Sequence, residues 1–512
     1  MRKFYTAQDV ALCASQGENI IFIERGDVVT SVAREEADRR NIRFVYKNED
    51  SSAAALGGSA GFDTAAPART AQTGFITADI PASSAPAAET ETSAAQAVKV
   101  CDRPSEYISP YKSNRIDSRV KALDYKGLLS EAEIDRWRKD FPILERVAHL
   151  GNCSQGAQSK QVLSAINRYL DNWGGVGMDW DSWVEEVDAA KAEFAKLIGA
   201  QKEEIAVAAS VSDLVSSIAN SLDYTGKRNK IVVTDAEFPT VDYVWLANQR
   251  HGAKVDFIAV NENHQIDISE YDRYIDENTL LTSATHVYYL NGFKQDPAKM
   301  AEIAHSKGSL FLLDSYQCLG TEPVDVKKMN IDILVSGCLK YLFGVPGIAF
   351  MYVNKDLIQS LKPSVTGWFG QMNPFQFQTR YNDWANTASR FDTGTPPVLT
   401  GYAARAGLEI INQVGVEKIK DHVDMLSAYA LSGCLARGLK TISPLDVSKK
   451  GGTTAIVCGD KVDSHTMEKL LRQRNVIGSG RGDVIRFAPH FYTKVNEIDY
   501  ALDMVKDILD NI

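Results

Sequence analysis

The sequence predicts an α/β fold with a large, mainly parallel sheet, followed by a smaller C-terminal α+β domain. Apolar strands alternate with helical segments from Val207 to Tyr352, which is the pattern of a parallel sheet with crossover helices. Two of these strands lead to charged residues, Asp314 and Lys340. With 512 residues, the chain is long enough for more than one domain and for a large hydrophobic core.

Composition and charge argue against several classes of partner. The formal net charge of −10 and the absence of a basic stripe argue against nucleic acid. No apolar run approaches the roughly 20 residues of a membrane-spanning helix, and the N-terminal MRKFYTAQDV lacks the apolar core of a secretory signal. The 7 cysteines have no CxxC or zinc-like spacing, so we expect a reduced, cytoplasmic chain without a metal site.

Residues 1–48 are expected to form a small α/β unit. The expected elements are a helix over Ala7–Ser15 capped by Thr6, a strand over Ile20–Ile23, a second helix capped by Thr30 or Ser31, and a strand over Ile42–Tyr46. The pattern TAQDV…GDVVTSVAREEADRRNIRFVY resembles the N-terminal segment of some ethanolamine-utilisation microcompartment proteins. A small appended interaction domain of unknown use is an equally good interpretation.

Residues 49–100 are expected to be a disordered linker. Their composition shifts to Ala, Ser, Gly, Thr and Pro, as in SSAAALGGSAGFDTAAPART. Such a segment buries too little apolar area to offset the loss of chain entropy on folding. A linker at this point suggests that residues 1–48 dock to a partner, such as a shell or cargo protein of a bacterial microcompartment. The protein would then lie inside that compartment rather than free in the cytoplasm.

Residues 101–400 are expected to form the large domain, opened by a helical arm, and residues 401–512 the small domain. Amphipathic patterns predict the helices and short apolar runs predict the strands. In the large domain, the expected helices are Ser130–Lys139, Ser159–Leu170, Trp180–Leu197 and one from about Asp213, and the expected strands are Ile205–Ala208, one ending at Thr234, Leu310–Leu313 and Ile331–Val335. Helices from Leu399 onward lead into the small domain. Its expected elements are the strands Thr454–Cys458 and Val484–Phe487, the helix Ser464–Arg474 and a final helix from Glu497.

Asp314 and Lys340 are the candidate centre of the site. The carboxyl ends of neighbouring parallel strands meet at one edge of a sheet, where open α/β sheets bind ligands. An acid and a lysine there suit pyridoxal 5′-phosphate, because the lysine can form a Schiff base and the acid can keep the pyridine nitrogen protonated. Each residue alone would more often be a turn residue or a surface charge. Gln317 and the Gly-rich turn after Lys340 favour the cofactor interpretation.

The same stretch carries a family resemblance. The pattern D-x-x-Q at Asp314–Gln317, an apolar strand, SGCLK and GVPGIAF together resemble the class V branch of fold-type I pyridoxal-phosphate enzymes, which includes kynureninases, cysteine desulfurases and related lyases. The resemblance covers about Phe141–Ile512. It implies a fold-type I large and small domain, an α-amino acid substrate, transfer of the α-proton by Lys340, and a bond from Gln317 to the cofactor's phenolic oxygen.

The Ser-rich turn after Ile205–Ala208 is the candidate phosphate site. Free backbone N–H groups and the dipole at a helix N-terminus favour a phosphate. The resemblance implicates Ser210, Val211 and Ser212, although the family often has Thr where Val211 stands. Helix capping by Ser210 or Ser212 is the alternative interpretation.

Two aromatic residues are implicated by the resemblance. Phe238, in the segment EFP, corresponds to the kynureninase Phe that lies over the cofactor ring, and it could instead fill the core beneath the sheet. Tyr289 stands where kynureninases have Tyr and desulfurases have Asn. Its phenol would exchange a proton at the β-side of the substrate or bond the cofactor hydroxyl. Asn291 is the nearby alternative.

Further residues are implicated at the edges of the site. TGWFGQ resembles the segment whose Trp, here Trp368, approaches the phosphate from the neighbouring subunit, and RFDTGTPPVL implicates Thr395 as a phosphate ligand across the same interface. Both imply a homodimer with shared sites, although Trp368 could instead be only an interface anchor.

An arginine in the small domain and the loop Gly151–Ser159 are the candidate substrate contacts. Arg486 stands where the family has the arginine that binds the α-carboxylate, a task that suits the planar guanidinium, and Arg481 is the competing choice. The loop resembles the kynureninase loop at the substrate entrance and implicates Asn152. An ordinary polar turn is the alternative.

The reaction is narrowed but not determined by these residues. A desulfurase needs a thiolate-forming cysteine near the C-terminal loop, but IGSGRGDVIRF has none and Cys458 lies in an expected strand. Phe238, GWFG and Tyr289 therefore favour kynureninase-like Cβ cleavage or another β-elimination, such as C–S lyase chemistry. Transamination, which needs no further group, stays open, and so does a non-catalytic, shell-docked binding protein.

Overall fold

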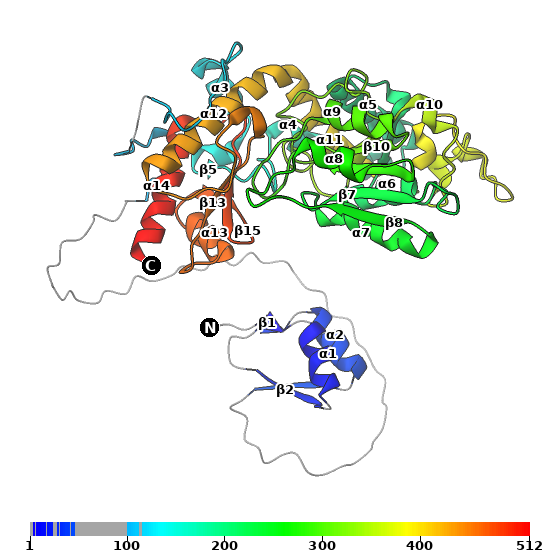
Figure 1. Ribbon diagram of the computed structural model, residues 1–512, viewed down its shortest axis with the longest axis horizontal. Helices are drawn as coiled ribbons and strands as arrows, with labels where there is room; N and C mark the ends of the chain where they lie inside the picture. The colour runs from blue at the N-terminus through cyan, green and yellow to red at the C-terminus, as the bar shows by residue number, and fades with distance from the viewer. Residues whose placement is uncertain are drawn as a thin grey trace, which may run out of the picture. The chain divides into compact units, whose positions relative to one another are not determined.

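A computed structural model describes residues 4–5, 7–16, 18–23, 28–29, 31–40, 42–46, 100–111 and 115–512. The chain divides into two compact units, Met1–Glu91 and Thr92–Ile512 (Figure 1). Each unit is described by itself. The linker expected over 49–100 lies, up to residue 99, outside the described residues.

The N-terminal unit packs two helices against short parallel strand pairs. Its elements are α1 (Ala7–Ser15), α2 (Ser31–Arg40), β1 (Phe4–Tyr5) paired with β3 (Val28–Val29), and β2 (Ile20–Ile23) paired with β4 (Arg43–Tyr46). A small core is formed by Val10, Cys13, Ala33, Ala37 and Ile42. The expected first helix and first strand are confirmed, and the proposed caps Thr6 and Thr30 lie outside the described residues.

Within residues 115–512, the centre of the second unit is a seven-stranded sheet in the order β6-β12-β11-β10-β9-β7-β8. The strands are β6 (Ile205–Ala208), β12 (Ala349–Val353), β11 (Ile333–Gly337), β10 (Leu310–Asp314), β9 (Thr279–Thr285), β7 (Lys230–Thr234) and β8 (Lys254–Ile258). Strand β12 is antiparallel to both of its neighbours, and the other adjacent pairs are parallel. The expectation of a mainly parallel sheet is confirmed.

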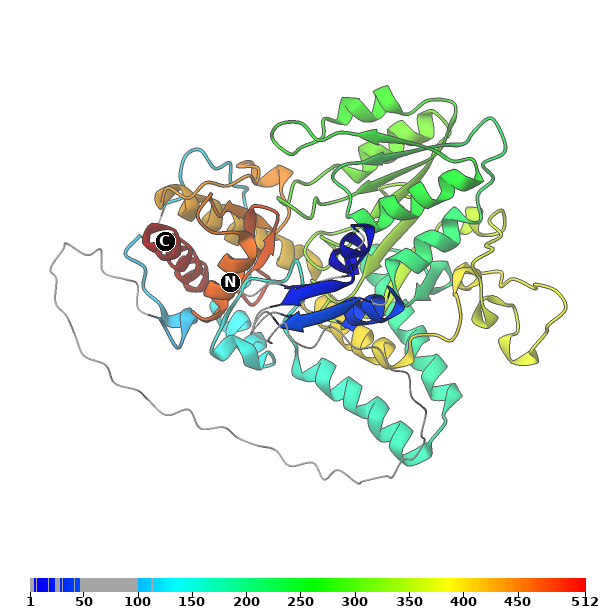
Figure 2. The same cartoon turned by 90° about the horizontal axis from the view of Figure 1, so that it is seen from below.

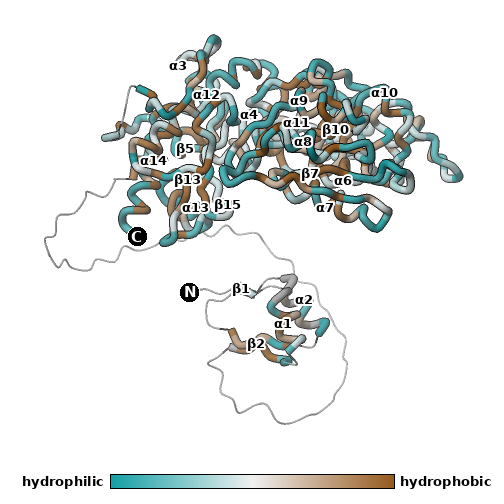
Figure 3. Tube along the Cα trace, viewed as in Figure 1, coloured by the Kyte–Doolittle hydropathy of each residue, from teal (hydrophilic) through white to brown (hydrophobic). Residues whose placement is uncertain are grey.

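Alternating side chains bury both faces of this sheet. On β10, Phe311 and Leu313 face one hydrophobic core, whereas Leu312 faces the other, as the two-residue period of a strand requires. The first core includes residues of α5 (Trp180–Ile198), α8 (Ile268–Tyr274), α9 (Pro297–Ser306) and α11 (Val398–Val414), and the second those of α6 (Val211–Ala219) and α7 (Pro239–Ala247). Apolar stretches accordingly run through the interior of this unit (Figure 3).

The small domain is an antiparallel sheet covered by helices. Strand β16 (Val484–Phe487) pairs with β13 (Thr454–Val457) and β15 (Ser479–Arg481). The helices are α12 (Val416–Ala436), α13 (Ser464–Arg472) and α14 (Val495–Asn511). The arm joins this domain because β5 (Ala148–His149) pairs with β14 (Val476–Ile477).

The arm contributes α3 (Glu131–Arg138), capped by Ser130, and α4 (Lys160–Val176). Figure 2 shows α4 and α5 as a helical hairpin whose tip points away from the sheet. The remaining short helices are α10 (Lys355–Ile358) and the 3₁₀ turns η1 (Pro104–Glu106), η2 (Pro142–Glu145), η3 (Lys202–Glu204), η4 (Asn248–His251), η5 (Trp368–Gly370), η6 (Pro374–Gln376), η7 (Ala388–Phe391) and η8 (Val447–Lys449).

The expected boundary between the large and small domains, at residues 400 and 401, lies inside α11. This helix packs against α4 and α5, and Gly415, with a φ of 91°, turns the chain into α12. The domain limits given by the sequence stay predictions. Among the described residues, no helix is long and apolar enough to span a membrane.

Candidate active site

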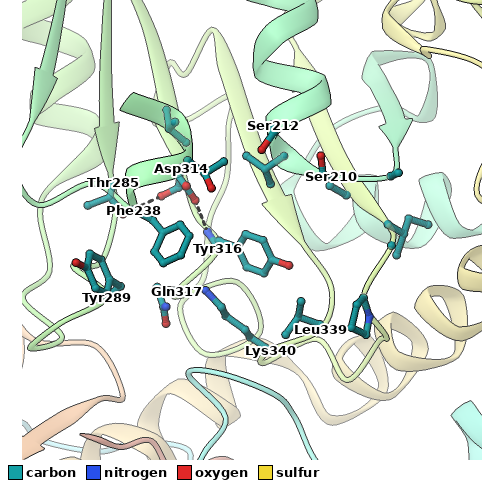
Figure 4. Close-up of a pocket in the computed structure, with 18 of the residues that line it drawn as sticks. Ser210, Ser212, Phe238, Thr285, Tyr289, Asp314, Tyr316, Gln317, Leu339 and Lys340 are labelled. Carbon is teal, nitrogen blue, oxygen red and sulfur yellow. Dashed lines mark hydrogen bonds between the residues drawn. The ribbon is translucent and has the colours of Figure 1, made fainter. Parts of the chain in front are cut away.

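A cavity of about 330 Å³ opens at the carboxyl ends of β9 and β10 (Figure 4). Its wall is built from strand ends and from the first turns of the helices that follow strands, which is where open α/β sheets bind ligands. The lining residues include Ser154, Ala209, Ser210, Val211, Ser212, Phe238, Thr240, Val241, Thr285, Tyr289, Asp314, Tyr316, Gln317, Leu339, Lys340 and Gly347. Most of the residues predicted from the sequence therefore share one cavity.

Asp314 and Lys340 meet because β10 and β11 are parallel neighbours. Asp314 pairs with Val335 of β11, so the end of β10 lies beside the segment that leads through Gly337 to Lys340. Asp314 is 4% exposed, and its Oδ1 accepts the backbone N–H of Tyr316 at 2.8 Å. Burial lowers the pKa of Lys340 to about 8, although Asp314 opposes this shift. About a tenth of the side chain is then the free, nucleophilic amine at pH 7, far more than at an ordinary lysine.

The amine of Lys340 lies between two aromatic rings. Its Nζ is 5.6 Å from the centroid of the Phe238 ring and 4.2 Å from that of the Tyr316 ring. In Figure 4 the carboxyl group of Asp314 lies at the opposite end of the gap between the rings. A flat aromatic molecule in this gap would have an amine at one end and a buried acid at the other. Tyr316 was not expected from the sequence.

Glu237 is a second buried acid beside Asp314 that sequence reasoning missed. Its Oε1 accepts the backbone N–H of Phe238 at 2.9 Å, and Oε2 has no donor among the described residues. The two buried carboxyl groups interact electrostatically, which favours a proton on one of them. Burial and the charge of Asp314 raise the pKa of Glu237 well above its ordinary value. We therefore assign this proton to Glu237.

Behind Asp314 lies a neutral pair, His286 and Cys318. The backbone N–H of His286 donates to the carbonyl of Asp314 at 2.8 Å, and the Cys318 Sγ is 3.0 Å from His286 Nδ1. Burial lowers the pKa of His286 to about 3 and raises that of Cys318 well above its ordinary value. Both side chains are therefore neutral, and Cys318 is a buried structural residue.

Gln317 and the start of α6 offer polar groups to a ligand. The Gln317 amide donates to the carbonyl of Cys153 at 3.3 Å, and its Oε1 is buried without a partner in the described part of the chain. At α6, the Ser210 Oγ accepts from the backbone N–H of Asp213 and donates to its carboxylate at 2.8 Å. Capping therefore occupies the Ser210 hydroxyl, and the backbone N–H groups at the helix start are what remains for a phosphate.

Arg486 joins the small domain to the rim of the cavity. It lies on β16, is 1% exposed, and donates through Nη1 to the carbonyl of Tyr289 at 2.6 Å and through Nη2 to Ser479 Oγ at 2.6 Å. The ring of Tyr289 contacts that of Phe238 edge-on, with centroids 5.3 Å apart. The competing Arg481 is exposed at the end of β15.

Four predicted residues do not line this cavity, as far as the described chain goes: Asn152, Trp368, Thr395 and Arg486, the last of which contacts the rim residue Tyr289. Asn152 donates to the carbonyl of Ala488 at 2.7 Å and accepts from the phenol of Tyr492 at 2.6 Å, so the fold already uses both of its polar groups. Trp368 donates from its indole to Thr395 Oγ1 at 3.2 Å, outside the cavity. Their roles stay predictions. The side-chain oxygen of Asn291, the alternative to Tyr289, accepts the backbone N–H of Phe293.

The cavity residues fit pyridoxal 5′-phosphate. The rings of Phe238 and Tyr316 line the cavity, Lys340 and Asp314 stand at opposite ends of the space between them (Figure 4), and the Gln317 Oε1, which has no partner among the described residues, suits a hydroxyl. Among the described residues, no group of three or more His, Cys, Asp or Glu side chains could hold a metal ion.

The family pattern of class-V aminotransferases matches residues 154–485. The chain belongs to this family. Members of the family are pyridoxal-phosphate-dependent enzymes, so the expected family and enzyme class are confirmed. An uncharacterized aminotransferase of Bacillus subtilis, YcbU, is 38% identical over 72% of this chain and 97% of that protein.

Other relatives differ in their reactions. A kynureninase of Pseudomonas fluorescens is 26% identical over 73% of this chain and 92% of its own length, and a probable cysteine desulfurase of Streptomyces coelicolor is 26% identical over 68% and 87%. Among solved structures, a cysteine desulfurase of Thermococcus onnurineus has a TM-score of 0.67 at 20% identity, covering 77% of this chain and 100% of that chain. This likeness confirms the expected fold-type I arrangement.

Proposed function

We propose that the protein is a pyridoxal-phosphate-dependent enzyme acting on an α-amino acid, and that it cleaves a bond at the substrate's β-carbon. One observation carries the cofactor assignment: the partly deprotonated amine of Lys340 lies between two aromatic rings, with the buried carboxyl of Asp314 at the far end of the gap. This arrangement suits the aldehyde and the pyridine nitrogen of a single planar cofactor.

Each residue has a distinct task in this proposal. The bound cofactor supplies an electron sink for negative charge at the α-carbon. Lys340 holds the cofactor and, once free, takes the α-proton. Asp314 keeps the pyridine nitrogen protonated, Gln317 bonds the phenolic oxygen, and the backbone of Val211 and Ser212 binds the phosphate. Arg486 binds the substrate carboxylate through the two parallel bonds that a guanidinium can make.

Cleavage at the β-carbon is favoured by Tyr289 and by the state of the cysteines. Tyr289 lines the cavity beside Phe238, where its phenol can exchange a proton at the β-side. The chain's cysteines are free thiols in the described residues, and apart from Cys101 they are buried. Burial raises the pKa of Cys458 to about 11. This supports kynureninase-like or C–S lyase chemistry without a cysteine persulfide.

Transamination is the second candidate. It is favoured by the similarity to YcbU, whose name is that of an aminotransferase. Transamination requires no side chain beyond those of Lys340, Asp314 and Arg486. After the first product leaves, the same cavity would accept the second substrate.

The test is an absorption spectrum of the purified protein during titration with a panel of amino acids, followed by product analysis. The yellow colour of bound cofactor is expected in the wild type and in Lys328→Ala, which changes an exposed lysine, but not in Lys340→Ala. Release of alanine, pyruvate or sulfide supports the lyase. A 2-oxo acid formed once per site, with turnover only when an acceptor 2-oxo acid is added, supports the aminotransferase. A colourless protein that binds no cofactor contradicts both.

The active form is a homodimer with shared sites. Trp368 belongs to an aromatic cluster with Trp180, Phe369, Phe375 and Phe377 next to the tip of the α4–α5 hairpin. Several apolar side chains there are exposed: Trp173, Val176, Met178, Phe375 and Phe377. A second copy covering this surface would bring Trp368 and Thr395 to the partner's phosphate site.

Mixing two inactive variants tests this arrangement. Lys340→Ala lacks the lysine, and Trp368→Ala/Thr395→Ala lacks the donated side chains. If the sites are shared, dimers formed from both regain activity, because one of their sites has every residue. If each chain holds a complete site, mixing restores nothing.

The N-terminal unit docks to a microcompartment shell or cargo protein, and the enzyme then works inside that compartment. The supporting observations are its own small core and its expected separation by a linker from the catalytic unit. A pull-down compares the full chain with a chain lacking residues 1–91. Loss of shell and cargo proteins from the shortened chain is expected, and unchanged co-purification contradicts the docking role.

A further inference from the structure

Tyr316 occupies space that exists only because residue 337 is glycine. A β-carbon at Gly337 would come closer than 3.0 Å to the Cζ, Oη and Cε2 atoms of Tyr316, a distance that real β-carbons do not show. The φ of Gly337 lies outside the left-handed region, so the backbone does not require glycine there. The last residue of β11 is therefore kept small by the ring of Tyr316.

The ring is also held in a defined place. The backbone N–H of Tyr316 donates to Asp314 Oδ1 at 2.8 Å, so the residue that supports the acid also presents the ring. On the other side of the Lys340 amine stands Phe238 at the start of α7. Burial raises the pKa of the Tyr316 phenol above its ordinary value, so the ring is neutral at working pH.

We propose that Tyr316 is the second aromatic wall of the cofactor site, opposite Phe238, and that Gly337 is small in order to leave this wall in place. A pyridine ring between them would have an aromatic ring on each side. A protonated pyridine ring carries positive charge, which the negative faces of both rings attract. This inference rests on the proposed function, since it assigns a residue to the same cofactor.

The experiment is a titration of cofactor-free protein with pyridoxal 5′-phosphate, followed by absorbance and by intrinsic fluorescence. Tyr316→Phe keeps the wall, and its Kd is expected to stay within about twofold of the wild type, whereas Tyr316→Ala raises it about tenfold. Gly337→Ala, which pushes the ring into the gap, weakens binding at least as much. Tyr243→Ala, which removes an exposed tyrosine from α7, leaves the Kd unchanged.

The double variant Gly337→Ala/Tyr316→Ala makes the test specific. If the glycine serves the ring, Gly337→Ala has no further effect once the ring is gone, so the double variant binds like Tyr316→Ala alone. Additive losses overturn the coupling, and an unchanged Kd in Tyr316→Ala overturns the wall. Circular dichroism checks folding, and Tyr316→Leu, which keeps bulk without an aromatic face, replaces any alanine variant that unfolds. A wild type that binds no cofactor refutes the proposed function instead.

Discussion

The amine of Lys340 gives the site a pH dependence. Its pKa is lowered to about 8 by burial, and only the unprotonated amine attacks an aldehyde. The rate at which cofactor-free protein binds pyridoxal phosphate should rise about tenfold per pH unit below pH 8 and level off above it. Stopped-flow absorbance measures this rate. A rate that still rises towards pH 10.5, the ordinary value for lysine, would show that burial does not act on Lys340.

Glu237 is expected to carry a proton in cofactor-free protein well above neutral pH. Burial and the charge of Asp314 raise the pKa of the Glu237 carboxyl well above its ordinary value. In an infrared difference spectrum at pH 8.5, Glu237→Gln should lose a band of protonated carboxylic acid. Asp242→Asn is the control, because Asp242 has a pKa of about 7 and is mostly ionised at that pH. No lost band would mean that Glu237 is ionised.

The same Glu237→Gln variant should keep its cofactor. The glutamine amide can donate to Asp314 and accept from the Phe238 N–H, as a protonated acid can. Glu237→Leu leaves Asp314 without that donor, and its affinity for the cofactor should fall.

Arg486 should act on the substrate rather than on the cofactor. Arg486→Gln removes a buried charge that faces the carboxylate, a loss of about 2–5 kcal/mol in binding, so kcat/KM should fall at least about 30-fold. The Kd for pyridoxal phosphate should change little. The exposed Arg481→Gln is the matched control and should leave both constants near the wild-type values. If kcat/KM falls in Arg481→Gln and not in Arg486→Gln, Arg481 is the residue that binds the substrate carboxylate.

At the scale of single residues, the sequence predicted side chains that the fold brings together at the ends of strands. Asp314, Gln317, Lys340, Phe238 and Tyr289 all line the cavity. Tyr316 and Glu237 were missed for a physical reason. The role of Tyr316 depends on Gly337, which lies on the neighbouring strand. The protonation of Glu237 depends on Asp314, which lies on a different strand of the sheet. Such pairs have no signature in local spacing.

Among the elements, α11 positions the loop that carries Lys340. A β-carbon at Gly407 would come closer than 3.0 Å to the carbonyl oxygen of Leu342. Gly407→Ala should shift this loop, lower the melting temperature and weaken cofactor binding.

Gly226→Ala, in the loop between α6 and β7, is the matched control, because apart from its chain neighbours no heavy atom of the described residues lies within 4 Å of the new β-carbon. It should stabilise the protein by up to about 1 kcal/mol, since alanine restricts the unfolded chain more than glycine does, without changing cofactor binding. Equal effects of both substitutions would mean that α11 does not restrain the loop. Differential scanning calorimetry and cofactor titration measure both properties.

The elements themselves were largely predictable because their apolar periods are regular. The antiparallel direction of β12 could not be predicted from the sequence. Residues 338–348 connect it to β11 without a helix, and a parallel neighbour would have required a crossover connection. Helix α11 was expected to lead into the small domain, but its apolar residues pack on α4 and α5. Sequence periodicity reveals an apolar face and not the surface that covers it.

For the molecule as a whole, the catalytic unit should be independent of the N-terminal one. Residues 92–512 contain their own sheet and cores. Deleting residues 1–91 should leave kcat/KM within about twofold and the main unfolding transition in place, because domains with separate cores fold as units. Calorimetry and steady-state kinetics measure this. A large loss of stability or activity would show that the N-terminal unit contributes to the catalytic fold.

The contact between Gly337 and Tyr316 also has an evolutionary consequence. A side chain can appear at position 337 only after position 316 has become small, because the reverse order passes through a steric clash. Shrinking the tyrosine first removes an aromatic face but creates no clash. Epistasis thus gives the pair a preferred direction of change. In a mutational library, substitutions at 337 should be accepted mainly in clones that already carry a small residue at 316.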